Sequence, residues 1–299
     1  MGPTASGKTE IAARLCKRFP FSVVSVDSAL VYRGMDIGTS KPAAAVRGEI
    51  PHHLIDVCDP AEAYSAGRFR RDATGLIEAI RGRGRTPLLV GGTMLYFRSL
   101  VRGLAPLPEA DPALREQIDR RARELGWPAL HRELASRDPD AAARIRPGDA
   151  QRIQRAIEVL ELTGQPLSRL QQQAVPSHYR FRAFALMPCP REELYRRIAS
   201  RLDKMMLAGL LDEVRRLFVR GDLGPDLPSI RAVGYRQLWA HLAGQRGLED
   251  AVDDARRATR QLAKRQMTWL RSEQELEWVR DLGDRELNRI RAVLSEACP

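Results

Sequence analysis

Between residues 9 and 26 the hydrophobic pattern changes its period. Over residues 9–19 apolar side chains recur at helical spacing, with Ile11, Leu15 and Phe19 on one side, which predicts an amphipathic helix. A short continuous apolar run follows at residues 21–26, which predicts a buried strand. This segment is therefore expected to run from a covering helix into the interior of a sheet.

The same alternation continues further along the chain. Residues 69–81 have a helical pattern, residues 87–90 form a second apolar run before Gly91-Gly92-Thr93, and residues 183–187 are strand-like again. Strands that alternate with helices predict an α/β fold with a mostly parallel sheet covered by helices.

A long helical stretch interrupts this alternation. Residues 111–173 are highly charged and helical in pattern, without a convincing strand, and the chain is helical again from residue 192 onward. We therefore expect an α/β core of residues 1–110 and 179–299, with C-terminal helices. Residues 111–178 are expected to form an inserted all-helical lobe.

Composition and charge narrow the class of protein. Of the 299 residues 43% are hydrophobic, enough for a sizeable core. There is no apolar run of about 18 residues and no signal pattern, so we expect a cytoplasmic protein with no membrane partner. The net charge of +11 favours a polyanionic partner, although an arginine-rich composition is an alternative cause.

The cysteines and histidines show no metal-ligand pattern. Cys16, Cys58, Cys189 and Cys298 are far apart and form no CxxC pair, which argues against a disulfide framework or a structural zinc site. The adjacent histidines at residues 52–53 have no third histidine at ligand spacing, so a hydrogen-bonded structural role is predicted for them.

A glycine-rich loop occupies residues 2–9. Its sequence, Gly2-Pro3-Thr4-Ala5-Ser6-Gly7-Lys8-Thr9, fits the phosphate-binding pattern G-x-x-x-x-G-K-S/T at every constrained position. Glycines let backbone N–H groups close around phosphate oxygens, the following helix directs its positive end at the anion, and Lys8 adds a full charge. The Thr9 hydroxyl is placed to ligate Mg²⁺. The loop predicts a phosphate site without specifying the compound.

The surroundings of this loop differ in two ways from those of a typical phosphate loop. A phosphate loop normally follows a strand, whereas here Met1 immediately precedes Gly2, so that strand is expected to be missing from this sequence. The strand predicted at residues 87–90 ends in glycines and lacks the Asp that usually helps to hold Mg²⁺. The missing Asp argues against a hydrolase, and it does not exclude a small-molecule kinase.

Asp27 directly follows the strand predicted at residues 21–26. Ligands of open parallel sheets bind beyond the carboxyl ends of the strands, which puts Asp27 on the same edge as the phosphate loop. There its carboxylate could take a proton from an acceptor that lies beside a phosphorylated donor. The alternative is an Asp that only caps a turn.

Further motifs follow the loop in a definite order along nearly the whole chain. They are Val26-Asp27-Ser28-Ala29-Leu30-Val31-Tyr32, Gly34-Met35-Asp36-Ile37-Gly38-Thr39, Lys41-Pro42, Pro51-His52-His53-Leu54, Tyr64-Ser65-Ala66, Phe69-Arg70-Arg71-Asp72, Gly91-Gly92-Thr93-Met94-Leu95-Tyr96, Gln151-Arg152-Ile153-Gln154-Arg155-Ala156, Val233-Gly234-Tyr235-Arg236-Gln237 and Thr259-Arg260-Gln261-Leu262-Ala263-Lys264-Arg265-Gln266. Together they closely resemble the bacterial tRNA dimethylallyltransferases, also called tRNA isopentenyltransferases.

This resemblance implies a fold and a reaction. The implied fold is a P-loop core like that of nucleotide kinases, with an inserted helical lobe that helps to clamp the anticodon stem-loop of tRNA. The implied reaction transfers a dimethylallyl group from dimethylallyl diphosphate to N6 of the adenine just 3′ of the anticodon and releases diphosphate. Mg²⁺ is the implied cofactor, and a monomer is the default expectation.

The resemblance also implies roles for residues. Asp27 accepts the proton of the adenine amine, while Thr9 and Arg201 act on the diphosphate together with the loop. The adenine must be flipped out of its stack to reach them. RNA contacts are implied for Asp27, Ser28, Ala29, Leu30, Thr93, Gln151, Arg152, Ile153, Gln154 and Arg155. On the helix of this last group, Ile153 can face inward, leaving Arg152 and Arg155 free for phosphates.

A second basic helix is predicted at residues 256–271. Arg260, Lys264 and Arg271 recur at spacings of four and seven and so share a face. A solvated face is the alternative, and within the family pattern we favour contact with RNA phosphates. Further candidates for the same surface are Arg231, Tyr235 and Arg236.

Two functions of other classes stay open at this point. A small-molecule kinase that uses ATP would share the phosphate loop, but it would not need the basic helices. An RNA-binding protein with a regulatory nucleotide site would keep its function without the Asp27 carboxylate.

Overall fold

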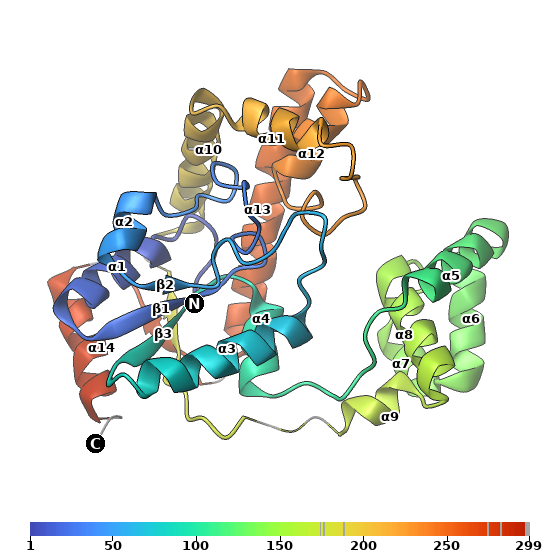
Figure 1. Cartoon of the computed structure of the whole chain (residues 1–299), viewed down its shortest axis with the longest axis horizontal. Helices are drawn as coiled ribbons and strands as arrows, with labels where there is room; N and C mark the ends of the chain where they lie inside the picture. The colour runs from blue at the N-terminus through green and yellow to red at the C-terminus, as the bar shows by residue number, and fades with distance from the viewer. Residues whose placement is uncertain (174, 176, 188, 274, 282, 297–299) are drawn as a thin grey trace. The chain divides into compact units, whose positions relative to one another are not determined.

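The computed structural model describes residues 1–173, 175, 177–187, 189–273, 275–281 and 283–296 (Figure 1). The chain divides into two compact units, Met1–Arg98 together with Arg180–Pro299, and Ser99–Tyr179. The fold is mixed α/β, with small parallel sheets and many helices. Within the described residues, no helix has both the length and the apolar character needed to cross a bilayer.

The first unit contains a three-stranded parallel sheet in the order β2-β1-β3. These strands are β1 (Phe21–Val26), β2 (His52–His53) and β3 (Thr86–Gly91). β1 pairs with β3 along its whole length, from Phe21 opposite Thr86 to Val26 opposite Gly91. The carboxyl ends of β1 and β3 therefore lie side by side, and the residues that follow them share one edge of the sheet.

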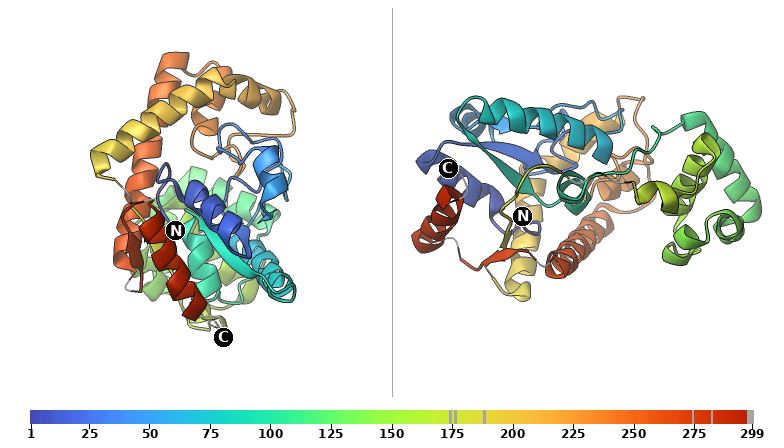
Figure 2. Two further views of the ribbon diagram at one scale, coloured as in Figure 1. Left: turned by 90° about the vertical axis from the view of Figure 1, so that its left-hand side faces the viewer. Right: turned by 90° about the horizontal axis from the view of Figure 1, so that it is seen from below.

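Helices cover both faces of this sheet, which explains why every residue of β1 is buried. α1 (Lys8–Arg18) packs through Ala12 against Val23 of β1, while α3 (Ala66–Arg81) contacts β1 and β3 from the opposite face (Figure 2). The sequence predicted α1, β1, α3 and β3 to within three residues at each end. It missed β2, which has two residues.

A second parallel sheet pairs β4 (Phe184–Leu186) with β5 (Glu277–Val279). β5 corrects the expectation of helix alone after residue 192. Met1 lies alongside β4, because its amine donates to the Phe184 carbonyl at 2.7 Å and the Leu186 N–H donates to the Met1 carbonyl at 2.9 Å. Burial, and secondarily the charge of Lys8, lower the pKa of this amine to about 5. α14 (Asp284–Glu296) packs here through Leu287 and Ile290.

Four helices complete the first unit around the carboxyl edge of the β1–β3 sheet. They are α10 (Arg191–Leu207), α11 (Leu210–Phe218), α12 (Tyr235–Leu242) and α13 (Leu248–Ser272). α10 and α13 pack through Leu194, Ile198, Ala263 and Met267. The short α2 (Ala44–Glu49) precedes β2, and α4 (Met94–Val101) follows β3.

In the second unit every described element is a helix. α5 (Pro112–Leu125), α6 (Trp127–Arg137), α7 (Pro139–Arg144), α8 (Ala150–Thr163) and α9 (Leu167–Gln171) surround a core of their own that includes Ile118, Leu130, Leu134, Ile153 and Ile157. Asp111, Asp138 and Asp149 cap α5, α7 and α8, because each side chain accepts a backbone N–H of the first turn. The apolar side of each helix packs into this core, and the caps stabilise the helix starts.

Candidate active site

The phosphate loop is tightly wound and ends directly in α1. Gly7 caps the helix at a φ of 87°, and Ala5 also has a positive φ of 62°, so two backbone positions are left-handed. A Cβ on Gly2 would lie 2.7 Å from the Ser6 Oγ and 3.1 Å from the Leu186 carbonyl oxygen. A larger residue would have to displace the Ser6 side chain and crowd β4, and the loop ends directly at the amino end of α1, where helices favour anions.

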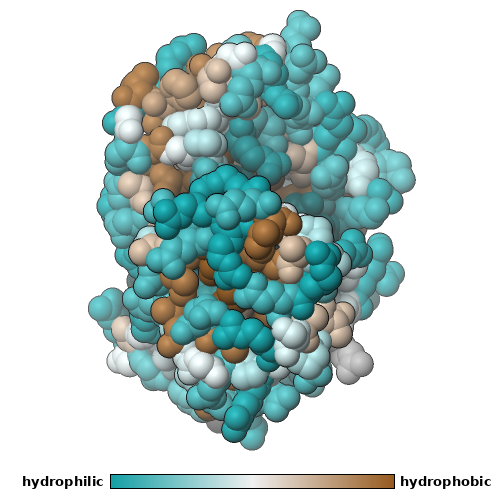
Figure 3. Space-filling model, turned by 90° about the vertical axis from the view of Figure 1, so that its right-hand side faces the viewer, coloured by the Kyte–Doolittle hydropathy of each residue, from teal (hydrophilic) through white to brown (hydrophobic). Residues whose placement is uncertain are grey.

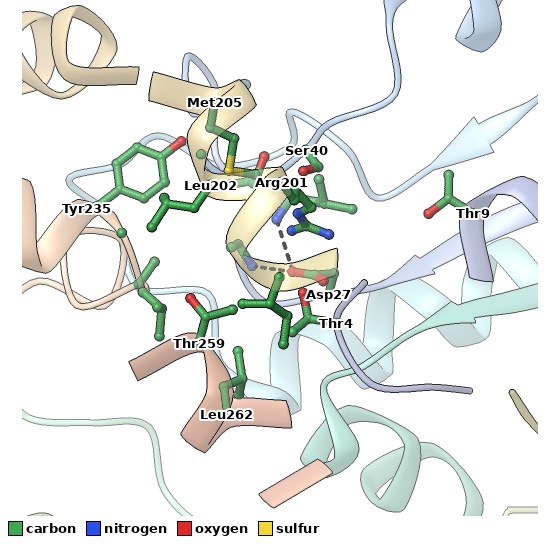
Figure 4. A pocket seen from close by; sticks show the side chains of 18 of the residues that line it. Thr4, Thr9, Asp27, Ser40, Arg201, Leu202, Met205, Tyr235, Thr259 and Leu262 are labelled. Atoms are coloured by element: carbon green, nitrogen blue, oxygen red, sulfur yellow. Dashed lines mark hydrogen bonds between the residues drawn. The ribbon is translucent and has the colours of Figure 1, made fainter. Parts of the chain in front are cut away.

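Polar residues from three separate segments meet at one cavity of about 160 Å³ (Figure 4). Thr4, Lys8 and Thr9 come from the loop and the start of α1, Asp27 follows β1, and Arg201 projects from α10. Apolar residues of α10, α11 and α13 line the rest of the cavity. The structure thus brings together the loop, the carboxylate and the arginine that the sequence predicted for one site.

The charges at this cavity favour a bound anion. Burial lowers the pKa of Lys8 to about 8; the Asp27 carboxylate opposes this shift, and the Arg201 charge adds to it. Burial likewise lowers the pKa of Arg201, against the attraction of Asp27. Two partly desolvated cations therefore face one carboxylate, and an anion with more than one negative charge would relieve their mutual repulsion.

This titration gives a first testable prediction. Only the protonated ammonium attracts an anion, so the affinity for inorganic diphosphate should fall as the pH rises through about 8. Between pH 8 and pH 9 we expect a loss of roughly fivefold, measured by calorimetry at constant ionic strength. The Lys8→Met variant, titrated in parallel, corrects for protonation of diphosphate itself. Equal slopes for the two proteins would show that Lys8 does not titrate at the anion site.

One oxygen of Asp27 is held in place by the backbone. Its Oδ1 accepts the N–H groups of Ala29 at 2.9 Å and Leu30 at 3.4 Å, as in an Asx turn. Among the described residues, no hydrogen bond to Oδ2 is found. The adjacent Ser28 N–H donates to Thr93 Oγ1 at 2.9 Å, so the segments that follow β1 and β3 are linked. The carboxylate therefore combines a fixed orientation with an oxygen left for a ligand.

Gln266 of α13 connects two sides of the cavity. Its Oε1 accepts the Thr4 N–H at 2.9 Å, and its Nε2 donates to the Gly92 carbonyl at 2.8 Å. The side chain thus holds the phosphate loop against the segment that carries Thr93. Gln266 stands at the end of one of the family motifs, but its role could not be predicted, because a contact across 262 residues leaves no local pattern in the sequence.

A buried carboxylate fixes the loop at residues 36–40, which borders the cavity through Gly38, Thr39 and Ser40. Glu213 accepts the N–H groups of Asp36, Ile37 and Gly38 at 2.9, 2.8 and 3.1 Å, and the Tyr235 hydroxyl at 2.5 Å. Lys41 pins the far end of this loop by donating to the Tyr32 carbonyl at 2.9 Å and to Asp36 at 2.5 Å.

Tyr235 is buried and does not lie on the protein surface. It was a candidate for an RNA-binding surface, whereas its side chain is fully buried and faces the cavity. Burial first, and then the charge of Glu213, raise the pKa of its hydroxyl. The neighbouring Arg231 and Arg236 are exposed, as a surface role requires.

The predicted RNA residues of α8 separate into two groups. Gln151 and Arg152 are exposed, whereas Ile153 is buried and Gln154 donates to Asp119 at 2.7 Å. Arg155 is not free for phosphates, which corrects the sequence-based expectation. Its guanidinium donates to Glu158 at 2.5 Å and to the Pro108 carbonyl at 2.7 Å.

Glu158 explains why Arg155 is held. Its carboxylate is fully buried and also accepts two hydrogen bonds from Arg115, at 2.8 and 3.0 Å, and the Asp111 N–H at 2.9 Å. Burial alone would raise the pKa of Glu158, but these hydrogen bonds together lower it. A buried carboxylate needs such partners, so Arg155 belongs to the interior of the helical unit.

The basic face of α13 is present and solvent-accessible. Arg260, Lys264 and Arg271 are all exposed, and the Arg260 guanidinium lies 5.7 Å from the centre of the Tyr195 ring. Figure 3 shows another face, on which hydrophilic side chains surround a few apolar ones. The exposed basic side chains of α13 suit an anionic partner without identifying it.

The histidines and cysteines were predicted to have no role as metal ligands or in disulfides. His52 Nδ1 donates to the Ile50 carbonyl at 2.7 Å, which agrees with a hydrogen-bonded structural histidine. Cys16, Cys58 and Cys189 are free thiols, and Cys298 lies outside the described residues. Within those residues, no group of three or more His, Cys, Asp or Glu side chains could hold a metal ion.

Comparison with known proteins gives consistent results. Residues 30–273 match the model of the family described as IPP transferase. The tRNA dimethylallyltransferase of Bordetella petrii is 56% identical over 278 residues, 92% of this chain and 88% of that protein. Its counterpart in Methylococcus capsulatus is 54% identical over 300 residues, 98% of this chain and 96% of that protein.

Solved structures resemble the whole chain as well. The full-length tRNA isopentenylpyrophosphate transferase of Bacillus halodurans matches with a TM-score of 0.72 and 38% identity, over 99% of this chain and 94% of that one. A eukaryotic dimethylallyltransferase solved while acting on tRNA matches with a TM-score of 0.76 and 27% identity, over 98% of this chain and 76% of that one.

Proposed function

Because this chain belongs to the IPP transferase family, we propose that it transfers a dimethylallyl group from dimethylallyl diphosphate to tRNA and releases diphosphate. We further propose that the acceptor is N6 of the adenine next to the 3′ side of the anticodon. The observation that carries the proposal is the cavity in which Lys8 and Arg201 face Asp27. The two cations can bind the negatively charged diphosphate, and the carboxylate can take the proton that the acceptor amine loses.

The phosphate loop, Lys8 and Arg201 bind and stabilise the leaving diphosphate in this proposal. Negative charge on the diphosphate grows as the bond from C1 of the dimethylallyl group to oxygen breaks, and preorganised cations lower the energy of that state. The loop at the start of α1 and the parallel strands beside it support a P-loop core of the nucleotide-kinase type.

Mg²⁺ suits the residues at the start of α1. This ion usually binds through one or two protein oxygens together with substrate phosphates, so the Thr9 hydroxyl beside a bound diphosphate is an adequate protein ligand. When bound, it would neutralise part of the charge of the diphosphate.

Asp27 orients the adenine amine and takes its proton. The lone pair of this amine is delocalised into the ring, so the nitrogen becomes a nucleophile only as the proton leaves. The new bond joins N6 to C1, the C1–oxygen bond breaks, and the N6 proton passes to Oδ2 of Asp27. Oδ1 stays on the Ala29 and Leu30 N–H groups, so the carboxylate keeps its orientation.

Exposed residues of each unit are proposed to contact tRNA. A flipped adenine would reach the cavity past Ser28–Leu30 and Thr93, where the two strand ends are linked. We propose phosphate or base contacts of the anticodon stem-loop for Gln151, Arg152, Arg231, Arg236, Arg260 and Lys264, which are exposed. A cytoplasmic monomer is sufficient for this arrangement.

Mass spectrometry of tRNA nucleosides tests the proposed function. Purified protein is incubated with unmodified tRNA, Mg²⁺ and dimethylallyl diphosphate, and the tRNA is then digested. A five-carbon addition to an adenosine beside the anticodon is the expected product. Phosphate transfer from ATP to a small molecule, with unmodified tRNA, would instead favour the kinase.

The basic face of α13 gives a second prediction. Arg260→Ala should weaken tRNA binding and reduce the slope of log affinity against log salt concentration by about one, because one phosphate contact is lost. The measurement is tRNA binding across a salt series. Arg215→Ala is the control, since this exposed arginine of α11 already pairs with Asp212 at 2.5 Å. An unchanged slope for Arg260→Ala would remove this residue from the interface.

A further inference from the structure

The cavity has one polar end and one apolar end. In Figure 4, Asp27 and Arg201 lie together with Thr9 further to the right, whereas Leu202, Met205 and Tyr235 lie to the left of Arg201. The reaction proposed above uses the polar end alone. The hydroxyls beside the apolar side chains are already paired, because Tyr235 donates to Glu213 and Thr259 donates to the Ala255 carbonyl at 2.7 Å.

One face of α10 supplies both ends. Ile198, Arg201, Leu202 and Met205 recur at helical spacing and all line the cavity. Leu210 of α11 and Leu262 of α13 close the apolar end from two further directions. Ile198, Leu202 and Leu210 are at most 6% exposed, so this end is enclosed by packed hydrocarbon.

Tyr235 forms a rigid wall of the apolar end. Its hydroxyl is fixed by Glu213, which also holds three backbone N–H groups of the loop at residues 36–38. A Cβ on Gly38 would lie 2.6 Å from the Tyr235 ring and 2.8 Å from Leu210, so ring, loop and α11 are already in close contact. This wall cannot move back to admit a longer ligand without disrupting those contacts.

Met205 differs from this wall because it is unbranched and only partly buried. It lies on α10 one turn beyond Arg201, which faces the diphosphate end. A hydrocarbon chain that extends from a diphosphate at Lys8 and Arg201 would therefore pass Leu202 before it reaches Met205. The methionine is thus the adjustable part of the apolar end.

The size of the cavity suits a short chain. An apolar protein cavity of about 150 Å³ binds a single benzene molecule, which has six carbons. The two ends of this cavity together enclose about 160 Å³, so the apolar end alone is smaller than that and suits a five-carbon chain better than one twice as long. We propose that the apolar end holds the hydrocarbon chain of the donor and that Met205, against the fixed Tyr235, restricts the donor to five carbons. This inference rests on the proposed function.

Met205→Ala tests the inference. Wild type and variant are given dimethylallyl diphosphate or geranyl diphosphate with unmodified tRNA, and kcat/KM is measured for each donor from the mass of the modified nucleoside. We expect the geranyl-to-dimethylallyl ratio to rise at least about tenfold, because the variant removes most of a side chain from the end of the chain site. Leu207→Ala on the same helix, where the side chain is 89% exposed, should leave the ratio unchanged.

Donor binding without tRNA provides an independent measurement. Calorimetry with geranyl diphosphate should show tighter binding to Met205→Ala than to wild type, and Met205→Leu, which conserves volume, should behave like wild type. If the ratio stays constant while the KM for tRNA rises, the apolar end holds the adenine and the inference is wrong. If wild type transfers no dimethylallyl group at all, the proposed function fails, which is a different result.

Discussion

Replacing Asp27 by asparagine is expected to slow prenyl transfer by about 10²- to 10⁴-fold, the usual contribution of a positioned general base. This substitution should remove the proton-accepting oxygen and leave the surrounding turn intact. Asparagine keeps an Oδ1 that can accept the Ala29 and Leu30 N–H groups at 2.9 and 3.4 Å, so the turn after β1 should persist. The new amide replaces Oδ2, and it cannot accept a proton from the adenine.

Single-turnover kinetics and tRNA binding should separate the two roles of this residue. We expect the transfer rate at saturating donor to fall while tRNA affinity stays within about twofold, since one carboxylate contributes little to a polyanion interface. Asp212→Asn, an exposed carboxylate of α11, is the matched control. A variant as fast as wild type would overturn the assignment of Asp27 as base, and lost tRNA affinity at an unchanged rate would make Asp27 an RNA contact.

Replacing Lys8 by methionine should lower kcat/KM for dimethylallyl diphosphate by about 10²- to 10³-fold, comparable to the loss of one preorganised donor at a developing anion. Methionine preserves much of the length and removes the charge. The burial that lowers the pKa of Lys8 to about 8 also means that its charged form is disfavoured in the empty site. The variant should therefore unfold at the same temperature as wild type or slightly higher.

Lys17→Met provides a control on the same helix. Lys17 pairs with Glu49 at 3.3 Å on the surface, where both side chains are more than 60% exposed, so its loss should change neither rate nor melting temperature appreciably. Melting scans and donor-concentration series on both variants complete the test. A Lys8→Met protein that melts far below wild type would assign Lys8 to stability, whereas normal kcat/KM would exclude it from the diphosphate site.

The sequence predicted the long elements of the fold because their patterns are local. α1 and β1 could be recognised from one periodic run and one apolar run, and β3 from another. β2 and β5 have two and three residues, too few to show a period, and they exist because a partner strand lies beside them. For the second unit, the sequence placed a helical lobe at residues 111–178, while the compact unit spans Ser99–Tyr179.

The residues of the candidate site could likewise be predicted only where their sequence neighbours mark them. The phosphate loop and Asp27 are each marked by their neighbours in sequence, so they could be named in advance. Gln266 and Glu213 act on segments 174–262 residues away, and each looks like an ordinary polar residue of an amphipathic helix. Tyr235 and Arg155 were placed at the surface because the sequence does not reveal the buried acids, Glu213 and Glu158, that hold them.

The helix α13 has a consequence for how the two reactants influence each other. It presents Arg260 and Lys264 outward, and the same helix holds the Thr4 amide through Gln266. Any shift of α13 when nucleic acid docks would be transmitted to the loop that grips the donor. Thermodynamic linkage then demands reciprocity: the factor by which bound RNA changes donor affinity equals the factor by which bound donor changes RNA affinity.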